Sequence, residues 1–369
     1  MLDEFMTQKL SAIDGLVLDT ETTFADLTTL RVGGKPELCL RATLADAAIS
    51  AVKALDQASI PFVVVGGGSN LLVADEGIDV VALVLDFAEV SVDAETGVVR
   101  AEAGANWDEV VAASVEAGLG GIECLSGIPG TAGAVPVQNV GAYGAEISDV
   151  LNRVRLYTRE TGADEWVPAS DLDLAYRYSN LKFTHRAVVL EVELQLSTDG
   201  LSKPLRFGQL TQTPGERRPV AEVRSQVLQL RRGKGMVLDP TDNDTWSAGS
   251  FFTNPIVDSA VADNIQEIVR TERGAEDADR MPRHAVLAGS DGEEIKLSAA
   301  WLIERAGFAK GYPGVGPATL STKHTLALTN RGAATASDIV ALAREIRAGV
   351  AKRFGVELVP EPVWIGVSI

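Results

Sequence analysis

Cysteine, long apolar runs and basic residues are all scarce in this chain of 369 residues, and each scarcity excludes a class of protein. The two cysteines, Cys39 and Cys124, could form at most one bridge, so a disulfide-dense fold is excluded. No stretch approaches the ~18 uninterrupted apolar residues of a membrane span. Acidic residues outnumber basic ones, and the net charge of −18 repels nucleic acid and anionic membranes. We therefore expect neither of these as a partner.

An export signal and a metal site are also missing from the sequence. The first residues, MLDEFMTQKLSAIDG, carry acids and no apolar core, and so predict neither a secretory nor a transit signal. Both cysteines are then expected to be reduced and buried. His185, His284 and His324 are scattered, and no Cys/His spacing suits zinc, so no metal is predicted. We expect a cytoplasmic monomer.

The rest of the composition, 46% hydrophobic and 23% charged, is typical of a globular protein long enough for two or three packed units. Apolar periodicity predicts helices over residues 43–60 (capped by Thr43), 106–121, 221–235 and 335–355. Strands are predicted over 61–65, 77–87, 96–105, 186–197 and 362–369, and a hairpin over 152–168 with its turn at 161–164. The polar, proline-containing stretch 196–222 indicates an insertion or boundary loop. The pattern predicts an α+β protein.

The stretch PFVVVGGGSNLLVADEG, residues 61–77, runs from a strand directly into three glycines. It is not the dinucleotide fingerprint G-x-G-x-x-G, because apolar residues and no helix start follow it. It is not a Walker loop, because no Gly-Lys-Ser/Thr follows. Such a turn can form a nest of backbone donors for a pyrophosphate, or it can simply be a tight turn that needs positive φ.

A second glycine-rich stretch, LSGIPGTAGAVPVQNVGAYGAE over residues 125–146, favours the first alternative. Few of its side chains are large, so much of it is expected to be backbone that lies against a flat, bulky group. A loop that packs on another loop is the structural alternative. Two such segments in one half of the chain favour a bulky cofactor.

Five stretches in one consistent order resemble the family of UDP-N-acetylenolpyruvoylglucosamine reductases (MurB): VVVGGGSNLLV, SGIPGTAGAVPVQNVGAYGAE, YRYSNLKF, AGSFFTNP and PEPVWIG. The glycine loop by itself is shared with many flavin oxidases, whereas all five in order are specific. The resemblance runs from about residue 28 to residue 366. It implies an NADPH-dependent flavoenzyme that reduces the enolpyruvyl group of a UDP sugar to UDP-N-acetylmuramate, for peptidoglycan synthesis and cell-wall biogenesis.

The resemblance also implies the architecture and the cofactor site. The expected fold has a two-part FAD-binding region of the PCMH/vanillyl-alcohol-oxidase type over 22–200, with subdomains 22–88 and 89–200. A C-terminal α+β substrate-binding domain over 215–350 follows, and the segment 351–369 returns to the FAD-binding region. FAD is expected to be non-covalent, because no histidine or cysteine adjoins the glycine loop. The implied cofactor residues are Val65, Gly66, Gly67, Gly68, Ser69, Asn70, Leu71, Ile128, Pro129, Gly130, Gly133, Ala134, Gln138, Asn139, Gly141 and Ala142.

Three residues are catalytic if the family roles carry over. Ser250 would give the proton, although a serine after a glycine is more often a turn residue. Arg177 offers the planar two-pronged donor that a carboxylate or enol oxygen needs. Glu361 stands between two prolines before an apolar strand, where an acid is expected to have a partner. An ordinary ion pair between Arg177 and Glu361 is the structural alternative.

Further residues are implied in substrate binding. This set is Tyr143, Arg177, Phe207, Lys234, Asn254, Lys323, His324 and Glu361, in which the lysines and the histidine would meet the diphosphate. The alternative is a solvated surface position for the lysines and the histidine, a turn for Asn254 and simple packing for Tyr143. Phe207 is a departure, because the longer, loop-bearing form of the family has a tyrosine there. Its ring can still stack on a ligand, but a hydroxyl contact is lost.

Two other functions fit part of the sequence. Another FAD-linked oxidoreductase, such as a sugar-lactone or alcohol oxidase, would share the features of residues 63–146 without AGSFFTNP or PEPVWIG. A non-catalytic nucleotide-binding protein would have no use for Ser250, Arg177 and Glu361 together. A yellow purified protein would exclude the second alternative, and NADPH oxidation that depends on the enolpyruvyl UDP sugar would exclude the first.

Overall fold

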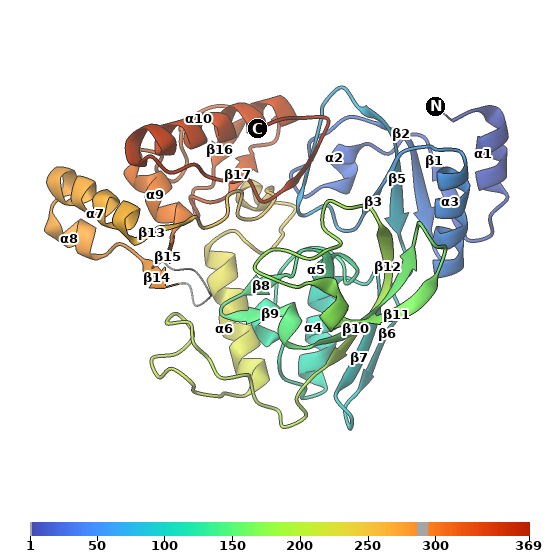
Figure 1. Ribbon diagram of the computed structural model, residues 1–369, viewed down its shortest axis with the longest axis horizontal. Coiled ribbons are helices and arrows are strands. Elements are labelled where there is room, and N and C mark those ends of the chain that lie inside the picture. The colour runs from blue at the N-terminus through green and yellow to red at the C-terminus, as the bar shows by residue number, and fades with distance from the viewer. Residues whose placement is uncertain (1, 286–293) are drawn as a thin grey trace. The chain divides into compact units, whose positions relative to one another are not determined.

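The structure, a computed structural model, describes residues 2–285 and 294–369 (Figure 1). The chain forms two compact units, which are described separately. Unit 1 consists of Met1–Leu27, Gly34–Ser69 and Glu76–Leu238. Unit 2 consists of Thr28–Gly33, Asn70–Asp75 and Asp239–Ile369. The boundaries expected from the sequence stay predictions.

The first sheet of unit 1 has the strand order β1-β2-β5-β3. β1 is antiparallel to β2, and β5 runs parallel to both β2 and β3. β2 and β3 lie on either side of β5 and run in the same direction, so the chain must cross over between them. Helix α3 (Ala45–Gln57) makes this crossover and packs on the sheet (Figure 1). The strands are β1 (Leu16–Asp19), β2 (Pro36–Ala42), β3 (Phe62–Val65) and β5 (Ile78–Leu85); α1 (Glu4–Ser11) and α2 (Phe24–Leu27) complete this part.

One local prediction is wrong here. Thr43 was expected to cap the helix, but the N-cap of α3 is Leu44, which makes no side-chain cap. The Thr43 hydroxyl donates instead to the carbonyl of Gly15, 3.0 Å away. The Thr43 hydroxyl, which the local pattern assigned to the helix end, is therefore bound by a residue distant in sequence, Gly15.

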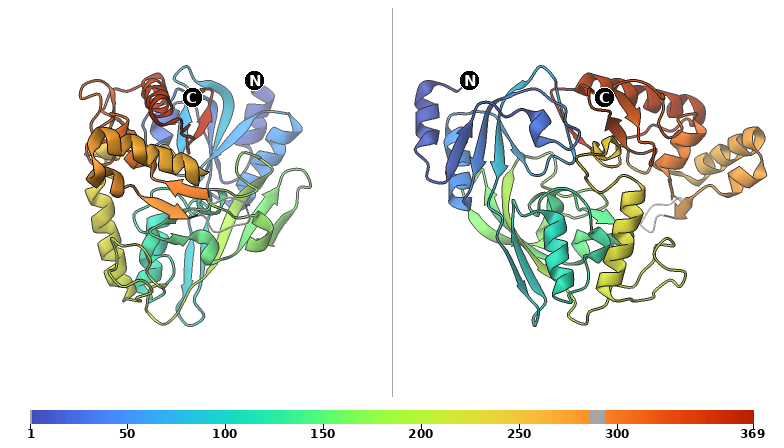
Figure 2. Two further views of the ribbon diagram at one scale, coloured as in Figure 1. Left: turned by 60° about the vertical axis from the view of Figure 1, so that its left-hand side comes forward. Right: turned by 180° about the vertical axis from the view of Figure 1, so that it is seen from behind.

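The second sheet of unit 1 is antiparallel, with the order β11-β10-β12-β7-β6. Its core includes the fully buried Trp107 of α4 (Trp107–Glu116), and α4 lies beside α6 (Val220–Gly233) (Figure 2). The predicted hairpin is confirmed, but its turn covers residues 159–163, between Thr158 and Asp164, instead of 161–164. The strands are β6 (Val90–Asp93), β7 (Val98–Glu102), β10 (Leu151–Thr158), β11 (Asp164–Pro168) and β12 (Ala187–Gln195).

Short elements connect these parts of unit 1. They are η1 (Glu123–Leu125), α5 (Ala134–Val137), β8 (Gly141–Ala142), β9 (Ala145–Glu146), η2 (Ile147–Asp149) and η3 (Ala169–Leu172). Both cysteines are buried and free, as expected, and burial raises the pKa of the Cys124 thiol to about 12. From 196 to 219 the chain forms neither helix nor strand, in agreement with the predicted loop.

Unit 2 packs helices around a core that contains the buried rings of Phe251 and Phe252. The predicted helix over 335–355 is α10 (Ala336–Phe354), which Thr335 caps and Gly355 ends at a φ of 69°. The apolar side predicted for it is buried: Ile339, Leu342, Ile346, Val350 and Phe354. The other elements are η4 (Asn243–Thr245), β13 (Ile256–Asp258), α7 (Ser259–Arg273), α8 (Ala275–Asp279), β14 (Arg283–Ala285), β15 (Glu294–Leu297), α9 (Ala299–Arg305), β16 (Ala318–Leu320) and β17 (Leu328–Asn330).

Unit 2 also contains a strand from the first quarter of the chain. β4 (Leu71–Val73), directly after the glycine loop, pairs in parallel with the C-terminal β18 (Val363–Ile365). Leu72 and the nearby Leu30 belong to the unit 2 core. Within the described residues, no helix combines the length and the apolar character that crossing a bilayer requires.

Candidate functional site: two glycine segments and a serine–glutamate pair

The two glycine-rich segments of unit 1 lie against each other. A Cβ added at Gly66 would stand 2.6 Å from Oγ1 of Thr131, and one at Gly67 would stand 2.7 Å from Cα of Gly130. The Ser69 hydroxyl donates to the carbonyl of Pro129 at 2.9 Å. Gly67 is thus required by contact with the backbone of Gly130 and Gly66 by contact with the side chain of Thr131, reasons that the sequence did not reveal.

The turn itself presents unused backbone donors. Gly68 has a φ of 59°, in the left-handed region that favours glycine. In the described part of the chain, no residue accepts a hydrogen bond from the N–H of Gly67, Gly68 or Ser69. Successive free amides in such a turn form a concave anion-binding site. These residues therefore fit a phosphate-bearing cofactor.

The second glycine segment is fixed at its start by charged residues. The carboxylate of Asp108 accepts from the N–H of Gly127 at 2.6 Å and pairs with Arg224 of α6 at the same distance. The guanidinium of Arg231, also on α6, donates to the carbonyls of Gly127 and Met236 at 3.3 and 2.7 Å. A ligand would therefore meet a backbone that α4 and α6 hold in place.

The end of this segment has features typical of a binding site. Oε1 of Gln138 is buried without a hydrogen-bond partner, and such an atom indicates a missing partner. Asn139 is fully buried and donates to Ala175 O at 2.7 Å. Asn139, Tyr143 and Arg177 have φ values of 39°, 52° and 54°. Left-handed residues of this kind cluster at functional sites.

The structure brings Arg177 to the second glycine segment. Its Nη2 donates to the carbonyl of Gly141 at 2.6 Å, and a Cβ at Gly141 would stand 3.1 Å from its Nη1. The buried Lys182 donates from Nζ to the carbonyl of Arg177 at 3.2 Å. The guanidinium is thus fixed beside the segment predicted to line the flavin.

Three predicted substrate residues also meet in unit 1. The rings of Tyr143 and Phe207 are edge to face with centroids 5.2 Å apart. Nζ of Lys234 is 5.7 Å from the centroid of the Tyr143 ring and donates to Oε1 of Gln209 at 3.1 Å. Phe207 is half exposed, so its ring is accessible to a ligand.

Unit 2 brings Ser250 and Glu361 onto neighbouring segments. The N–H of Glu361 donates to the carbonyl of Phe251 at 2.9 Å, and the N–H of Thr253 donates to the carbonyl of Val359 at 3.0 Å. The carbonyl of Glu361 accepts from Nδ2 of Asn70 at 3.4 Å. Asn70, at the end of the glycine loop, thus contacts the segment that carries Glu361.

Ser250 is held by its neighbours in sequence. Gly249 before it has a φ of 72°, and Phe251 and Phe252 after it are fully buried. Its own side chain is half-buried. Oδ1 of Asn254 accepts from the N–H of Ala299 at 3.0 Å, so this predicted substrate residue also holds the start of α9.

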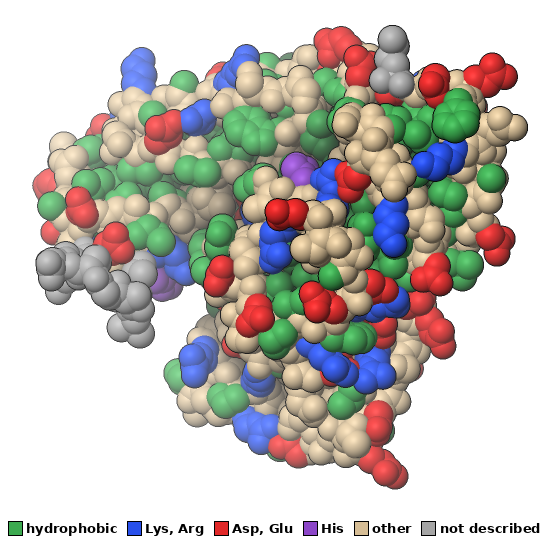
Figure 3. Space-filling model, turned by 45° about the vertical axis from the view of Figure 1, so that its right-hand side comes forward, with side chains coloured by type: hydrophobic (Ala, Val, Ile, Leu, Met, Phe, Trp, Pro, Cys, Tyr) green, Lys and Arg blue, Asp and Glu red, His purple; other side chains and the backbone are tan. Residues whose placement is uncertain are grey.

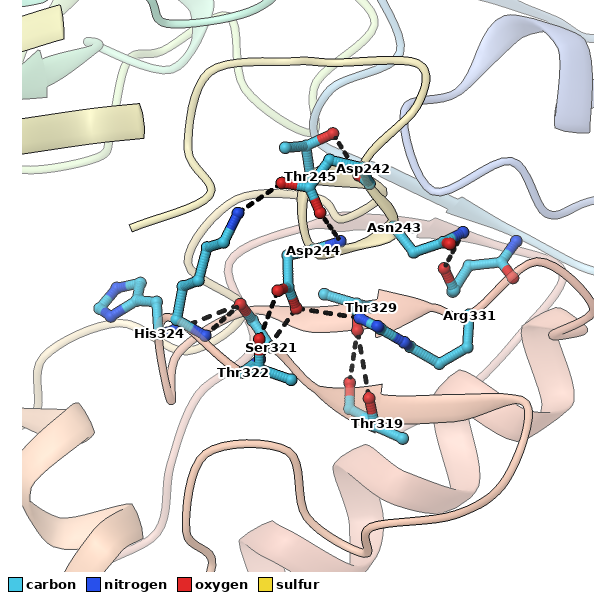
Figure 4. Close-up of polar contacts among 12 residues, drawn as sticks. Asp242, Asn243, Asp244, Thr245, Thr319, Ser321, Thr322, His324, Thr329 and Arg331 are labelled. Atoms are coloured by element: carbon cyan, nitrogen blue, oxygen red, sulfur yellow. Dashed lines mark hydrogen bonds and ion pairs between the residues drawn. The ribbon is translucent and has the colours of Figure 1, made fainter. Parts of the chain in front are cut away.

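Lys323 and His324 lie on a turn that is joined to the same region. Nζ of Lys323 pairs with Asp242 at 2.5 Å, which raises the pKa of the lysine. The N–H groups of Lys323 and His324 donate to the Ser321 hydroxyl at 3.0 and 3.3 Å (Figure 4). The N–H of Phe251 donates to the carbonyl of Leu326 at 2.7 Å. Besides Asn70 and Leu71, unit 2 therefore contains five predicted site residues: Ser250, Asn254, Lys323, His324 and Glu361.

Other predicted site residues are distributed between the units, and some residues of the site were not predicted. Unit 1 holds Val65 to Ser69, the segment 128–142, Tyr143, Arg177, Phe207 and Lys234, whereas Asn70 and Leu71 belong to unit 2. Thr131, Lys182 and Asp244 were not predicted from the sequence. Only the contact of Thr131 with a glycine, and the burial of the two charged groups, reveal them.

The distribution of surface charge adds a constraint on partners. On the face drawn in Figure 3, acidic and basic side chains are interspersed, and no patch of one sign dominates. A basic stripe of the kind that tracks a nucleic-acid backbone is not visible on that face.

Comparisons with known proteins agree with this geometry. A family model described as an FAD binding domain matches residues 36–163, which include both glycine segments. The fold and the site define an FAD-binding protein. A second family model, the C-terminal domain of UDP-N-acetylenolpyruvoylglucosamine reductase, matches residues 239–365.

Full-length relatives specify the family. The chain is 62% identical over 377 residues to UDP-N-acetylenolpyruvoylglucosamine reductase of Corynebacterium glutamicum (strain R), and all of both chains is covered. The enzyme of the same name from Mycolicibacterium smegmatis is 48% identical, with 96% of this chain and 98% of the relative covered. The solved MurB structure from Thermus caldophilus matches with a TM-score of 0.61 at 25% identity, over 95% of this chain and 98% of that one.

The chain therefore belongs to the UDP-N-acetylenolpyruvoylglucosamine reductase family. It is a flavin-dependent oxidoreductase that binds FAD, and the predicted α+β class with an FAD-binding region and a C-terminal domain is confirmed.

Proposed function

We propose that the protein uses NADPH to reduce the enolpyruvyl group of UDP-N-acetyl-3-O-(1-carboxyvinyl)-glucosamine to UDP-N-acetylmuramate, as a monomer in the cytoplasm. The observation that carries this proposal is the pairing of Phe251–Thr253 with Val359–Glu361. It puts the segment of Ser250, which we assign as the proton donor, beside the segment of Glu361, which we assign as its acidic partner. An alcohol or sugar-lactone oxidase has no need of such an arrangement.

The cofactor's place in the proposal is the pair of glycine segments. The free amides of Gly67, Gly68 and Ser69 would hold its pyrophosphate, and Gln138 would give its buried acceptor to the ligand. Bound FAD supplies the hydride for the reduction. The absence of a neighbouring histidine or cysteine favours a non-covalent cofactor, and NADPH is proposed as its reductant.

The protein must supply a proton and stabilise negative charge. Adding hydride to one alkene carbon leaves an electron pair that the substrate carboxylate delocalises as an enolate. We assign the proton for the other carbon to the Ser250 hydroxyl, which becomes an effective acid only beside a strongly basic carbanion from which water is excluded. The guanidinium of Arg177 is assigned to the developing oxyanion, and Glu361 is assigned to the same step of charge stabilisation.

The diphosphate would be held by cationic groups. Lys234, already between Tyr143 and Gln209, is assigned to it in unit 1, and Lys323 and His324 in unit 2. Tyr143 and Phe207 would contact the sugar or the uracil ring. Asn254 is assigned to the substrate through its amide nitrogen, since its Oδ1 is used by α9.

The test is to measure the two half-reactions separately by stopped flow. Ser250→Ala should leave reduction of the flavin by NADPH nearly unchanged and slow its reoxidation by the enolpyruvyl UDP sugar about 1,000-fold. Thr253→Val is the matched control, because this hydroxyl lies three residues away and donates only to the carbonyl of Val359. Equal losses in both half-reactions would contradict the role of Ser250, and no turnover of the sugar by the wild type would contradict the function.

A further inference from the structure

A buried acid of unit 2, Asp244 on η4, has no role in the chemistry above. It is 4% exposed, and both of its oxygens are engaged. Oδ1 accepts from the N–H of Thr322 at 2.8 Å and from Nη1 of Arg331 at 2.9 Å, and Oδ2 accepts from the Thr322 hydroxyl at 2.5 Å. Figure 4 shows the carboxylate between Thr322 and Arg331.

Asp244 thereby fixes the turn that carries Lys323 and His324. The turn is held from inside and from outside: the Ser321 hydroxyl accepts from the amides of Lys323 and His324 inside it. From outside, Asp242 pairs with the side chain of Lys323, and Asp244 binds both the amide and the hydroxyl of Thr322. Thr322 is exposed, so no packing of its side chain holds the turn in place. The carboxylate is therefore the main constraint on the position of Thr322.

The same residue is linked to the segment of Ser250. From η4 the chain continues through Ser247, which bridges Thr329 of β17, to Phe251, whose N–H binds Leu326. The residues 244–251 thus contact the 322–329 segment at three places. Of these three, only the contact at Asp244 touches the turn itself.

Energetics favour a positioning role over a purely structural one. Burial of the Asp244 carboxylate opposes its ionisation, but the hydrogen bonds from Thr322 and the charge of Arg331 outweigh burial, so its pKa lies below the ordinary value. Well-packed apolar residues commonly replace buried ion pairs without loss of stability. What an apolar pair cannot supply is the two-pronged acceptor that fixes both the amide and the hydroxyl of Thr322.

We infer that Asp244 is a positioning residue that holds the Lys323–His324 turn in place to receive the diphosphate of the substrate. The inference depends on the proposed function, because it takes the assignment of Lys323 and His324 to the diphosphate from there. Asp244 itself touches no substrate atom in this scheme and acts through Thr322.

Two variants test the inference in the flavin-loaded enzyme. Asp244→Asn removes the charge and one acceptor, and Thr322→Val removes the hydroxyl while Arg331 keeps its partner. Each should raise the KM for the enolpyruvyl UDP sugar, and the Kd for the unreactive product UDP-N-acetylmuramate, about tenfold, which corresponds to ~1.4 kcal/mol. The value of kcat and the flavin content should stay near those of the wild type, and Thr322→Ser should restore the wild-type KM.

Asp239→Asn is the control for loss of charge without loss of positioning, because the Asp239 carboxylate lies five residues away and accepts only from Thr241 in the described structure. Its charge still acts on Lys323, so Asp239→Asn should not raise KM. Unchanged KM in Thr322→Val, or a fall in kcat at constant KM, would overturn the inference. Lys323→Ala and His324→Ala distinguish a failure of the positioning role of Asp244 from a failure of the assignment of Lys323 and His324 to the diphosphate. If they raise KM while Asp244→Asn and Thr322→Val do not, only the positioning role fails; if they leave KM unchanged, the diphosphate assignment fails as well.

Discussion

The two units use buried carboxylates for different purposes. In unit 1, Glu193 of β12 accepts from Arg100, Arg153 and Asn152 at 2.6–2.8 Å and joins strands of the second sheet. In unit 2, Asp244 binds a turn that carries predicted site residues. The glycine segments of unit 1 present backbone amides, whereas unit 2 presents side chains. A site of backbone donors needs close packing and little charge, and a site of side chains needs other side chains to orient it.

The largest expected effect concerns the backbone site. Gly67→Ala places a Cβ 2.7 Å from Cα of Gly130, and neither backbone can yield without moving the turn. Flavin binding should weaken about a hundredfold, and the purified protein should be largely colourless. Absorbance of the flavin per protein measures this, with Gly233→Ala as the control, since nothing lies within 4 Å of its added Cβ. A fully yellow Gly67→Ala protein would contradict the close contact.

The contact at Gly67 also shows how far the sequence alone could lead. Periodicity was sufficient for α10, β12 and the hairpin of β10 and β11, because local spacing and turn residues determine them. The glycine run predicted a ligand-binding loop, but not that Gly130 and Thr131 oppose it. That contact depends on how segments sixty residues apart pack.

Motifs in the sequence predicted some residues of the candidate site and left others unpredicted. The resemblance supplied Ser250 and Glu361 by motif, and the structure added the pairing of their segments. Asp244 and Lys182 could not be found from sequence, because an acid or a lysine in a polar stretch is ordinarily solvated. Only burial and a specific partner make such a charge informative.

Loss of Glu193 is expected to change stability, whereas loss of Asp244 is expected to change KM. Hydrogen bonds from Arg153, only partly opposed by burial, lower the pKa of Glu193 from 4.5 to about 2. Its stabilising contribution is therefore complete above pH 4.5 and is lost as the pH falls toward 2. Glu193→Gln should lower the free energy of unfolding by about 2 kcal/mol at pH 7, and by progressively less below pH 4.5, without a change in KM.

Glu191 of the same strand is the matched control for this denaturation series. Burial raises the pKa of Glu191, so ionisation of this carboxyl costs more free energy in the folded than in the unfolded chain. Glu191→Gln should then be neutral or slightly stabilising at pH 7. A loss of stability at Glu191 as large as that at Glu193 would show that the arginine pairs are not the cause.

A smaller effect is expected at Asp242, whose carboxylate competes with the substrate diphosphate for Lys323. Asp242→Asn removes the charge beside Lys323, while the retained oxygen can still accept from the N–H of Asp244. The KM for the enolpyruvyl UDP sugar should fall about threefold at low salt, and the difference should shrink near 1 M salt as screening increases. Steady-state kinetics at two ionic strengths measure it. A raised KM would mean that Asp242 orients Lys323 instead of competing with the substrate.

The smallest effect is expected at Phe207. Phe207→Tyr adds a hydroxyl to a half-exposed ring that is edge-on to Tyr143, so it should lower KM by about two- to threefold through one solvent-exposed hydrogen bond. Phe207→Leu tests the ring itself and should raise KM by a similar factor. If both substitutions leave KM unchanged, the ring at 207 does not contact the substrate.

The pairing of β4 with β18 has a consequence for how this protein can be made and divided. The C-terminal unit contains Thr28–Gly33 and Asn70–Asp75, so a fragment starting at Asp239 lacks a strand and three core residues, Leu30, Val32 and Leu72. During synthesis β4 has no strand partner until β18 has left the ribosome. Unit 2 can therefore be completed only after β18 has been made, and a truncation that removes β18 takes away the partner of the strand that begins one residue after Asn70.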